Sequence, residues 1–334
     1  MRVGVTGASG YVGRALVRRL AGRHDTIVLL REGSTPSFGV PVHEVRGDIR
    51  DPDAVRSLAE ASDAVIHAAA YVHRAAATGR ERAECFGIND SGTRTLVAAL
   101  EATGRRPHLV FVSTTAVYGD RVHGAIEGAV PHPVTEYGKS KLLAEQYVMD
   151  AARRNAITAC VVRPAVVYGI GAPGNVARLL ATIQRGWLPR VGGARNRKSM
   201  VHVDDLAEAI VRAAERPDRT NGRTYNVAGE AVTVDTMAHA LAKGAAARVR
   251  LIPVPRMVAS LAAGTSRVLS LASGGRLPDA SRALDAFAGE ATVDAAAVAA
   301  DLGVSFRPAA LGLEDTAREW VRLGQSPAAT GWVG

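Results

Sequence analysis

Cysteine and aromatic residues are scarce in this chain, and each scarcity excludes a class of protein. Only two cysteines, Cys85 and Cys160, occur in 334 residues, and no other ligand pattern surrounds them. A disulfide framework and a zinc site are therefore both excluded, and we expect no metal. Aromatic residues make up 4% of the chain and hydrophobic residues 47%. Alanine and valine must fill much of a sizeable core.

Long apolar runs are also missing. No stretch is long enough to cross a bilayer, and the first residues lack the basic, apolar and small-residue succession of a secretion signal. We therefore expect a cytoplasmic protein without a membrane segment. Its length suits one nucleotide-binding domain with a second lobe.

Lysine is rare, although the chain is basic with a net charge of +9; four lysines and 37 arginines make up its 41 basic residues. The arginines are scattered among acids and glycines without a basic run, which argues against nucleic acid as a partner. An anionic small substrate, or a compositional bias alone, accounts for the charge. Two of the lysines, Lys139 and Lys141, lie in one segment, "TEYGKSKLLAEQ" at 135–146. Because the pKa of lysine can be tuned and that of arginine cannot, this segment is a candidate site.

Tyr137 precedes Lys141 by four residues in a segment of helical character, so the two side chains share a face. A phenol has an ordinary pKa of about 10, and a nearby ammonium favours its ionised form. We predict that Lys141 lowers the pKa of Tyr137 and makes it a proton donor and acceptor. The alternative is two exposed residues at the start of an amphipathic helix.

Strand-like and helical segments alternate along most of the chain, which predicts right-handed crossovers and an α/β fold with a doubly wound parallel sheet. We expect Asp51 to cap a helix from Pro52, and Asp204 to cap a second one. The expected strands lie within residues 1–7, 26–31, 42–51, 62–70, 108–119, 157–169 and 224–229.

From about residue 230 the chain is rich in alanine with scattered prolines, which indicates a smaller, mostly helical C-terminal lobe. We predict that residues 1–168 and 199–229 form the dinucleotide-binding domain. Residues 169–198 and 230–334 would form the substrate-binding lobe.

Gly7, Gly10 and Gly13 lie between the first strand and the first helix. Glycines in this context let the backbone approach a pyrophosphate whose charge the helix N-terminus meets. The alternative is a purely structural turn.

The end of the second strand bears on the cofactor. Arg31 follows there, with Ser34 close behind, and an arginine at this point accommodates a ribose 2′-phosphate. The sequence therefore favours NADP(H) over NAD(H), although Glu32 could instead serve NAD. Asp48 is a candidate partner of the adenine, with capping of the following turn as its alternative role.

Eight segments occur in the order typical of one family: "TGASGYVG", "GDIRD", "HAAA", "VSTTAVYG", "YGKSK", "VVRPAVVYG", "VHVDDLA" and "YNVAG". With them the chain resembles the extended short-chain dehydrogenase/reductases, and specifically the NAD-dependent epimerase/dehydratase family. Its last segment, from "EATVDAAAVAADLG" to "DTAREW", is similar to the end of nucleotide-sugar epimerases and 4-ketoreductases. The resemblance implies a Rossmann fold and a homodimer built through paired helices.

The resemblance also implies roles for matching residues. Tyr137 and Lys141 correspond to the acid/base tyrosine and its lysine, and Thr114 to the hydroxyl that holds the reacting oxygen. Ser113 takes that place, or contacts the substrate, if the preceding strand ends one residue earlier. The cofactor-binding positions implied, besides Arg31, are Gly7, Ser9, Gly10, Tyr11, Val12, Gly13, Asp48, Ile49, His67, Ala68, Ala69, Tyr137, Lys141 and Pro164.

Fewer positions are implied for the substrate. Arg197 or Lys198 would pair with a diphosphate, and Asn175 would touch the substrate from the loop after residue 169. A solvated surface is the alternative for the basic pair. Asn89 either steadies the site or satisfies loop backbone as a buried amide.

The function implied is the reduction of a keto group on an anionic nucleotide-linked sugar, with Tyr137 as general acid. Three alternatives stay open: a 4-epimerase with tightly bound NAD, a reductase of a non-sugar ketone or aldehyde, and a dinucleotide-binding sensor without turnover.

Overall fold

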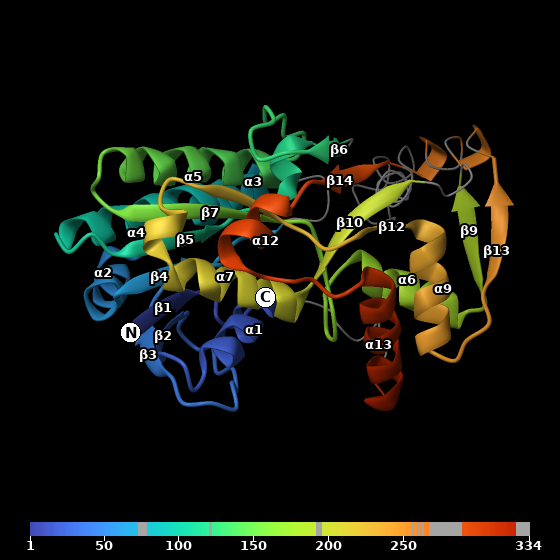
Figure 1. Cartoon of the computed structure of the whole chain (residues 1–334), viewed down its shortest axis with the longest axis horizontal. Helices are drawn as coiled ribbons and strands as arrows, with labels where there is room; N and C mark the ends of the chain where they lie inside the picture. Colours follow the sequence, from blue (N-terminus) through green and yellow to red (C-terminus); the bar gives the residue numbers. More distant parts are fainter. Residues whose placement is uncertain are drawn as a thin grey trace.

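A seven-stranded parallel sheet organises the first two thirds of the chain, in the order β11-β7-β5-β4-β1-β2-β3 (Figure 1). The computed structural model describes all residues except 73–78, 120–121, 192–195, 256, 260, 262–263, 267–288 and 325–334. The doubly wound parallel sheet predicted from the sequence is confirmed. Its strands are β1 (Arg2–Thr6), β2 (Asp25–Leu30), β3 (His43–Arg46), β4 (Ala64–His67), β5 (His108–Val112), β7 (Thr158–Pro164) and β11 (Thr224–Val227).

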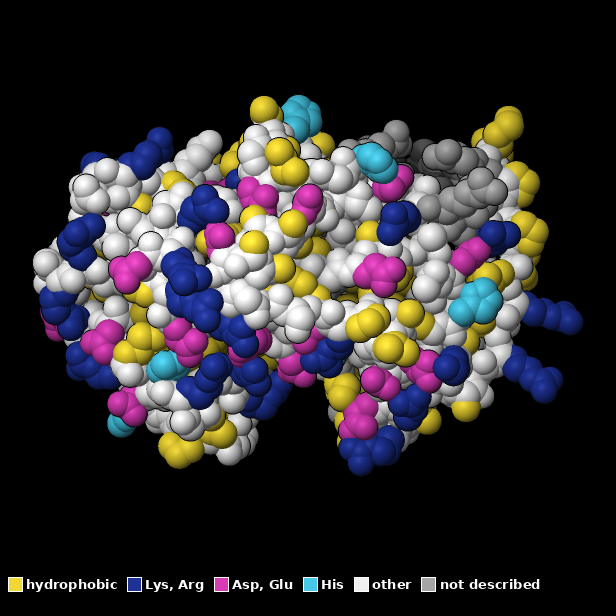
Figure 2. Space-filling model, viewed as in Figure 1, with side chains coloured by type: hydrophobic (Ala, Val, Ile, Leu, Met, Phe, Trp, Pro, Cys, Tyr) yellow, Lys and Arg dark blue, Asp and Glu magenta, His cyan; other side chains and the backbone are white. Residues whose placement is uncertain are grey.

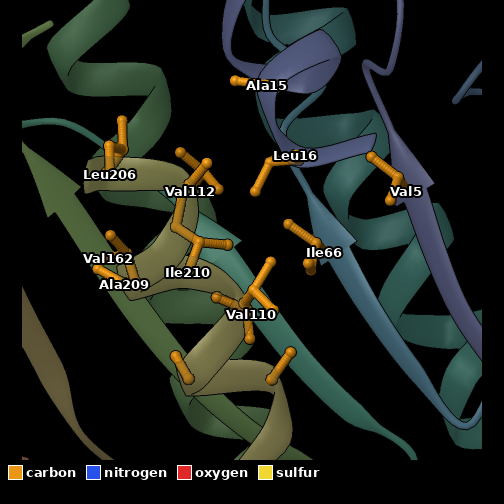
Figure 3. Close-up of a cluster of buried hydrophobic side chains, with 14 of the residues drawn as sticks. Val5, Ala15, Leu16, Ile66, Val110, Val112, Val162, Leu206, Ala209 and Ile210 are labelled. Atoms are coloured by element: carbon orange, nitrogen blue, oxygen red, sulfur yellow. The ribbon is translucent and has the colours of Figure 1, made fainter. Parts of the chain in front are cut away.

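Helices cover both faces of this sheet, because its strands are apolar on both sides. In β5, Val110 and Val112 point to one core while Leu109 and Phe111 point to the other. Figure 3 shows part of the first core, where β-strand valines meet Leu16 and the residues of a second helix. That face is covered by α1 (Tyr11–Leu20) and α7 (Val203–Glu215), and the other face by α2 (Pro52–Ala61), α4 (Gly92–Ala102) and α5 (Glu136–Arg153).

The helix starts follow the expected capping chemistry with one correction. The Asp51 carboxylate accepts the backbone N–H of Asp53 at 3.0 Å and starts α2 at Pro52, as predicted. Asp204, by contrast, is not the cap of α7. His202 holds that position, and its Nδ1 accepts the backbone N–H of Asp204 at 3.2 Å. The strand before α7 runs on to His202, so Asp204 falls inside the first helical turn.

The apolar composition of residues 108–119 predicts one strand, and this prediction is wrong. Strand β5 ends at Val112, and η2 (Thr115–Tyr118) forms a short 3-10 turn. The Thr114 hydroxyl caps this turn by accepting the backbone N–H of Ala116 at 3.1 Å. A side chain that competes for backbone N–H groups ends the strand here.

The C-terminal lobe combines helices with short strands. Strands β12 (Ala231–Thr233), β10 (Arg197–His202), β14 (Ala291–Val293) and β6 (Val122–Ala125) form one sheet, β8 (Val166–Tyr168) pairs with β10, and β13 (Arg250–Val254) pairs with β9 (Trp187–Val191). Its own hydrophobic core includes Tyr168, Leu180, Leu241 and Trp320. The helices of this lobe are α6 (Asn175–Gln184), α9 (Val234–Gly244) and α13 (Ala309–Arg322), whereas α12 (Ala296–Leu302) buries Val298 and Leu302 in the first core, against α7.

This third core is distinct from the two that flank the large sheet. The predicted domain bounds stay a proposal. Strands β6 and β8 lie within the predicted nucleotide-binding segment but pair with strands of the C-terminal lobe.

Within the described part of the chain, none of the helices combines the length and the apolar character needed to cross a bilayer. The same residues contain no group of three or more His, Cys, Asp or Glu side chains arranged to hold a metal ion. On the face shown in Figure 2, Lys and Arg side chains are interspersed with Asp and Glu.

Candidate active site

The glycine loop lies at the carboxyl edge of the sheet, between β1 and α1. Gly7 has a φ of 71°, and a Cβ there would lie 2.5 Å from the Ala69 nitrogen. At Gly13 a Cβ would lie 2.0 Å from the Gly7 carbonyl oxygen, so a larger residue does not fit. The Arg14 side chain closes the loop by donating from Nε to the Ser9 carbonyl at 3.0 Å. No side chain caps α1, so its first N–H groups are available to an anion.

The end of β4 supports this loop through a chain of hydrogen bonds. Thr6 Oγ1 accepts the Ala69 N–H at 3.2 Å and lies 2.6 Å from His67 Nδ1. His67 Nε2 lies 3.0 Å from the hydroxyl of Thr93. Burial lowers the pKa of His67 to about 3, so the ring is neutral. His67 thus supports the loop from inside the core, whereas Ala68 and Ala69 lie directly against Gly7.

Tyr137 and Thr114 meet at the start of α5. The Thr135 hydroxyl caps this helix by accepting the Gly138 N–H at 3.0 Å, which places Tyr137 in the first turn. The Thr114 side chain lies close enough to the Tyr137 phenol to oppose the rise of its pKa as a hydrogen-bonding neighbour. Ser113, the alternative to Thr114, is 2% exposed, and its hydroxyl donates to the carboxylate of Glu145. The structure therefore brings Thr114, rather than Ser113, to the phenol.

Lys141 lies one turn further along α5 and is fully buried. Its Nζ is 4.0 Å from the centroid of the Phe111 ring on β5, and it has no hydrogen-bond partner among the described residues. Burial lowers the pKa of Lys141 to about 7, and the charge of Glu145 opposes this shift. Burying an amine without a hydrogen-bond partner lowers the stability of the fold. An acceptor such as a hydroxyl would satisfy the Lys141 amine.

The prediction that Lys141 lowers the pKa of Tyr137 is wrong for the chain alone. Burial raises the pKa of Tyr137 to about 12, and the hydrogen bond from Thr114 only partly opposes this rise. Lys141 has a pKa of about 7, so its ammonium has lost its proton long before the phenol ionises. It therefore cannot stabilise the phenolate in this structure. Desolvation, which the four-residue spacing does not reveal, exceeds the effect of the neighbouring charge.

Asn89 is a buried amide that satisfies loop backbone next to the site, which is one of the two roles expected for it. Asn89 lies in η1 (Gly87–Ser91), a single π-helical turn between α3 (Gly79–Phe86) and α4. Its Oδ1 accepts the Tyr71 N–H at 2.7 Å, and its Nδ2 donates to the Tyr71 carbonyl at 3.0 Å. Nδ2 also reaches the Ser140 hydroxyl on α5 at 2.9 Å. Asn89 thus satisfies loop backbone and ties that loop to the helix that carries Tyr137.

The candidate cofactor residues after β2 and β3 are placed as follows. Arg31 is exposed directly after β2. Asp48 accepts both the Arg50 side chain, at 2.7 and 3.0 Å, and the Arg50 N–H at 2.9 Å. These bonds from Arg50 lower the pKa of Asp48, to which the Arg31 charge also contributes. Asp48 therefore caps the following turn, and its role towards the adenine stays a prediction. Ile49 is buried against Gly92.

The remaining candidate cofactor residues are Tyr11, Val12 and Pro164. Tyr11 begins α1, and its buried hydroxyl has no hydrogen-bond partner among the described residues. A Cβ on Gly169 would lie 2.6 Å from this hydroxyl, so the phenol of Tyr11 extends from the glycine loop to the end of β8. Val12 packs against the core, and Pro164 ends β7.

The candidate substrate residues are dispersed. The Arg197 guanidinium donates to the Ala231 carbonyl of β12 at 3.0 and 3.3 Å. Lys198 follows it on β10, so the two side chains point to opposite faces of that sheet. Asn175 begins α6, and its side chain lies outside the described part of the molecule. Arg197 and Lys198 therefore do not form one binding pair.

Sequence reasoning missed a buried ion pair beneath the site. Glu145 on α5 and Arg163 on β7 are 4% and 6% exposed, with Nη2 and Oε2 2.6 Å apart. One signal for it was present in the sequence, because Glu145 follows Lys141 by four residues and shares its helix face.

One family model and several curated proteins are similar to this chain in sequence. The model of the NAD dependent epimerase/dehydratase family matches residues 3–228. An uncharacterised protein of Sinorhizobium fredii, y4nG, is 33% identical over 80% of this chain and 66% of its own length. The N-acetyl-alpha-D-glucosaminyl-diphospho-ditrans,octacis-undecaprenol 4-epimerase of Escherichia coli O157:H7 is 32% identical, over 61% of this chain and 60% of its own length. The 2-alkyl-3-oxoalkanoate reductase of Stenotrophomonas maltophilia is 32% identical, over 64% and 66%.

The matched segments thus span less than two thirds of these relatives. Solved structures share the fold over nearly the whole chain. The Thermotoga maritima UDP-glucose 4-epimerase with UDP-glucose has a TM-score of 0.75 at 22% identity, covering 97% of this chain and 99% of that one. RMD from Pseudomonas aeruginosa, complexed with NADPH, has a TM-score of 0.71 at 24% identity, covering 96% and 98%.

The parallel sheet with the glycine loop at its carboxyl edge defines a Rossmann-type dinucleotide-binding fold. The residues fit a nicotinamide dinucleotide, since α1 offers uncapped N–H groups and the Lys141 amine lacks an acceptor. The chain belongs to the NAD dependent epimerase/dehydratase family.

Proposed function

We propose that the protein is an NADP(H)-dependent reductase of a keto group on a nucleotide-linked sugar, with Tyr137 as the proton donor. The observation that carries this proposal is the contact between Tyr137 and Thr114 one turn before a buried Lys141 amine without a partner. The bound nicotinamide would supply the hydride. Further proposals, implied by the family, are a homodimer and a cytoplasmic location.

The chain's own residues would divide the remaining tasks. With a pKa of about 12, Tyr137 is fully protonated at neutral pH and is therefore ready to donate to a carbonyl oxygen. Thr114 would hold that oxygen. Lys141 would donate to a ribose hydroxyl, and the glycine loop with the N-terminus of α1 would hold the pyrophosphate.

The keto-sugar substrate is proposed from the family and from the relatives' names. An epimerase of a diphospho-linked sugar is among the relatives, and the chain is basic overall. Arg197 and Lys198 remain candidates for separate contacts with a diphosphate. The oxoalkanoate reductase among the relatives makes a non-sugar ketone the second substrate class to test.

The test is to incubate the pure protein with nucleotide-linked keto-sugars, their alcohols and simple ketones while following NADPH absorbance and product configuration. Stoichiometric loss of NADPH with a keto-sugar is expected. A change of configuration at one carbon without net NADPH consumption would identify a 4-epimerase instead. One observation favours the reductase: Arg31 lies after β2, where an acid would serve NAD.

Replacing Arg31 with aspartate should reverse the cofactor preference. Arg31 is exposed where a 2′-phosphate would be met, and an acid there would repel the phosphate and accept the free ribose hydroxyl. We expect NADPH affinity to fall by about tenfold or more, which corresponds to about 1.4 kcal/mol, while NADH affinity rises. Fluorescence titration with both nucleotides measures this. Arg178→Asp, an equal charge change at an exposed residue of α6, is the control and should leave the ratio unchanged. An unaltered preference in Arg31→Asp would show that another residue reads the phosphate.

A further inference from the structure

The buried ion pair of Glu145 and Arg163 lies beneath the candidate catalytic groups. Arg163 Nε is 3.0 and 3.2 Å from the two Glu145 oxygens, and Nη2 is 2.6 Å from Oε2, so the contact is bidentate. Both side chains are more than nine-tenths buried. Removing two charges from water is costly, and apolar residues of similar volume often give equal stability. The fold alone therefore does not explain why a charged pair is found here.

The pair joins three segments that each carry a proposed site residue. Glu145 lies one turn after Lys141 on α5. Its carboxylate accepts the hydroxyl of Ser113, the residue before Thr114. Arg163 lies on β7 and precedes Pro164. A shift of the pair would thus move the segments of Lys141 and Thr114 together.

The rest of the Arg163 guanidinium is also held in place. Nη1 donates to the Tyr118 hydroxyl at 2.7 Å and to the Glu127 carbonyl at 3.2 Å. Arg163 Cζ lies 4.9 Å from the Tyr118 ring centroid. The Tyr118 hydroxyl in turn donates to Asn226 Oδ1 at 2.8 Å. These contacts fix the guanidinium between the η2 turn and β11, so it presents one orientation to Glu145.

We propose that the Glu145–Arg163 pair positions Thr114 and Lys141 for the reaction and that Glu145, one turn after Lys141 on the same face of α5, is the counter-charge of its amine. This inference rests on the proposed function. Three groups lie near the Lys141 amine besides Glu145: Cys85 on α3, the neutral His67 on β4 and the Phe111 ring on β5. Of these, Glu145 is the carboxylate whose charge reaches Lys141.

The direction of the pH effect follows from these contacts. Burial lowers the pKa of Lys141 to about 7, and Glu145 limits the fall. Without the Glu145 charge the pKa falls further, so the amine loses its proton at lower pH. If the protonated amine holds the cofactor ribose, NADPH affinity weakens as the pH rises through this pKa. Removing the Glu145 charge shifts that weakening to lower pH.

The experiment compares Glu145→Gln, Glu145→Asp and the charge-free double variant Glu145→Leu/Arg163→Met with the wild-type chain. NADPH affinity is measured by fluorescence between about pH 5.5 and 9, and turnover is measured separately. In Glu145→Gln and in the double variant we expect the pH profile of affinity to move down by about one unit, and turnover to fall about 10²-fold. Glu145→Asp keeps the charge and should keep the pH profile.

A matched control is Asp205→Leu/Arg307→Met, which removes the bidentate pair that joins α7 to residue 307. It should leave the pH profile of NADPH affinity unchanged. The proposal is overturned if the charge-free variant keeps the wild-type profile and turnover. It is equally overturned if that variant fails to fold while the control folds, because the pair would then serve the fold. If the wild-type chain turns over no carbonyl, the proposed function fails, and the affinity profile still tests the counter-charge.

Discussion

Tyr137→Phe is expected to lower turnover by about 10²–10⁴-fold, the usual effect of removing a general acid. The substitution removes one hydroxyl and keeps the ring, so the start of α5 and its Thr135 cap should be retained. The affinity for NADPH should change little, because the glycine loop and Lys141 are untouched. Steady-state kinetics together with NADPH titration separate the two effects.

Tyr147→Phe is the matched control, because Tyr147 lies on the same helix and its ring packs under the Arg94 guanidinium at 4.6 Å. Removing that hydroxyl should leave turnover unchanged. Full activity in Tyr137→Phe would show that the proton comes from elsewhere. A loss of NADPH binding equal to the loss of turnover would instead assign Tyr137 to the cofactor site.

The fold could be predicted because its signals are local. Buried parallel strands are apolar along their whole length, and Gly7 and Gly13 lie where only glycine fits. Asp51 and Pro52 mark a helix start that the structure confirms. Each of these features depends on a few neighbouring residues. The wrong prediction of one strand at 108–119 also has a local cause. The Thr114 hydroxyl ends the strand, and apolar composition does not reveal this.

The site was predicted less completely, because its electrostatics depend on burial. The spacing of Tyr137 and Lys141 gives their shared helix face but not their desolvation, which raises one pKa and lowers the other. Asp48 is bonded by Arg50, which the sequence does not reveal, and its contact with the adenine stays a prediction. Arg163 is 18 residues from Glu145 in the sequence, and only the packing of β7 against α5 joins them. Contacts between distant segments leave no such periodic signal.

Lys141→Met should have two opposite effects, a loss of function and a gain of stability. The loss follows from the missing amine: NADPH affinity should fall, and turnover with it by about 10²-fold or more. The gain follows because the wild-type amine is buried without a hydrogen-bond partner among the described residues. A buried polar group left unsatisfied costs about 1–3 kcal/mol, so the free energy of unfolding of the cofactor-free protein should rise by about that amount. Urea denaturation measures it.

The pH dependence of that gain distinguishes a charge effect from better packing. In the unfolded chain Lys141 keeps its ordinary pKa of 10.5, and in the folded chain its pKa is about 7. Between these values the unfolded chain binds one more proton, so this group makes the wild-type protein more stable as the pH rises. Below about pH 7 the amine is charged in both states, and the whole cost of its burial is present.

The stability advantage of Lys141→Met should therefore be largest near pH 6 and should shrink steadily towards pH 10. Lys139→Met is the control, because Lys139 is exposed on the same helix with its amine 3.0 Å from Glu136. It should show neither the gain nor its pH dependence. An advantage of Lys141→Met that is the same at every pH would mean that the methionine packs better and that the amine carries no charge. Saturating NADPH should reverse the order of stability, because the nucleotide stabilises only the chain that binds it well. A wild-type chain that stays less stable than Lys141→Met with saturating NADPH would show that the amine does not hold the cofactor.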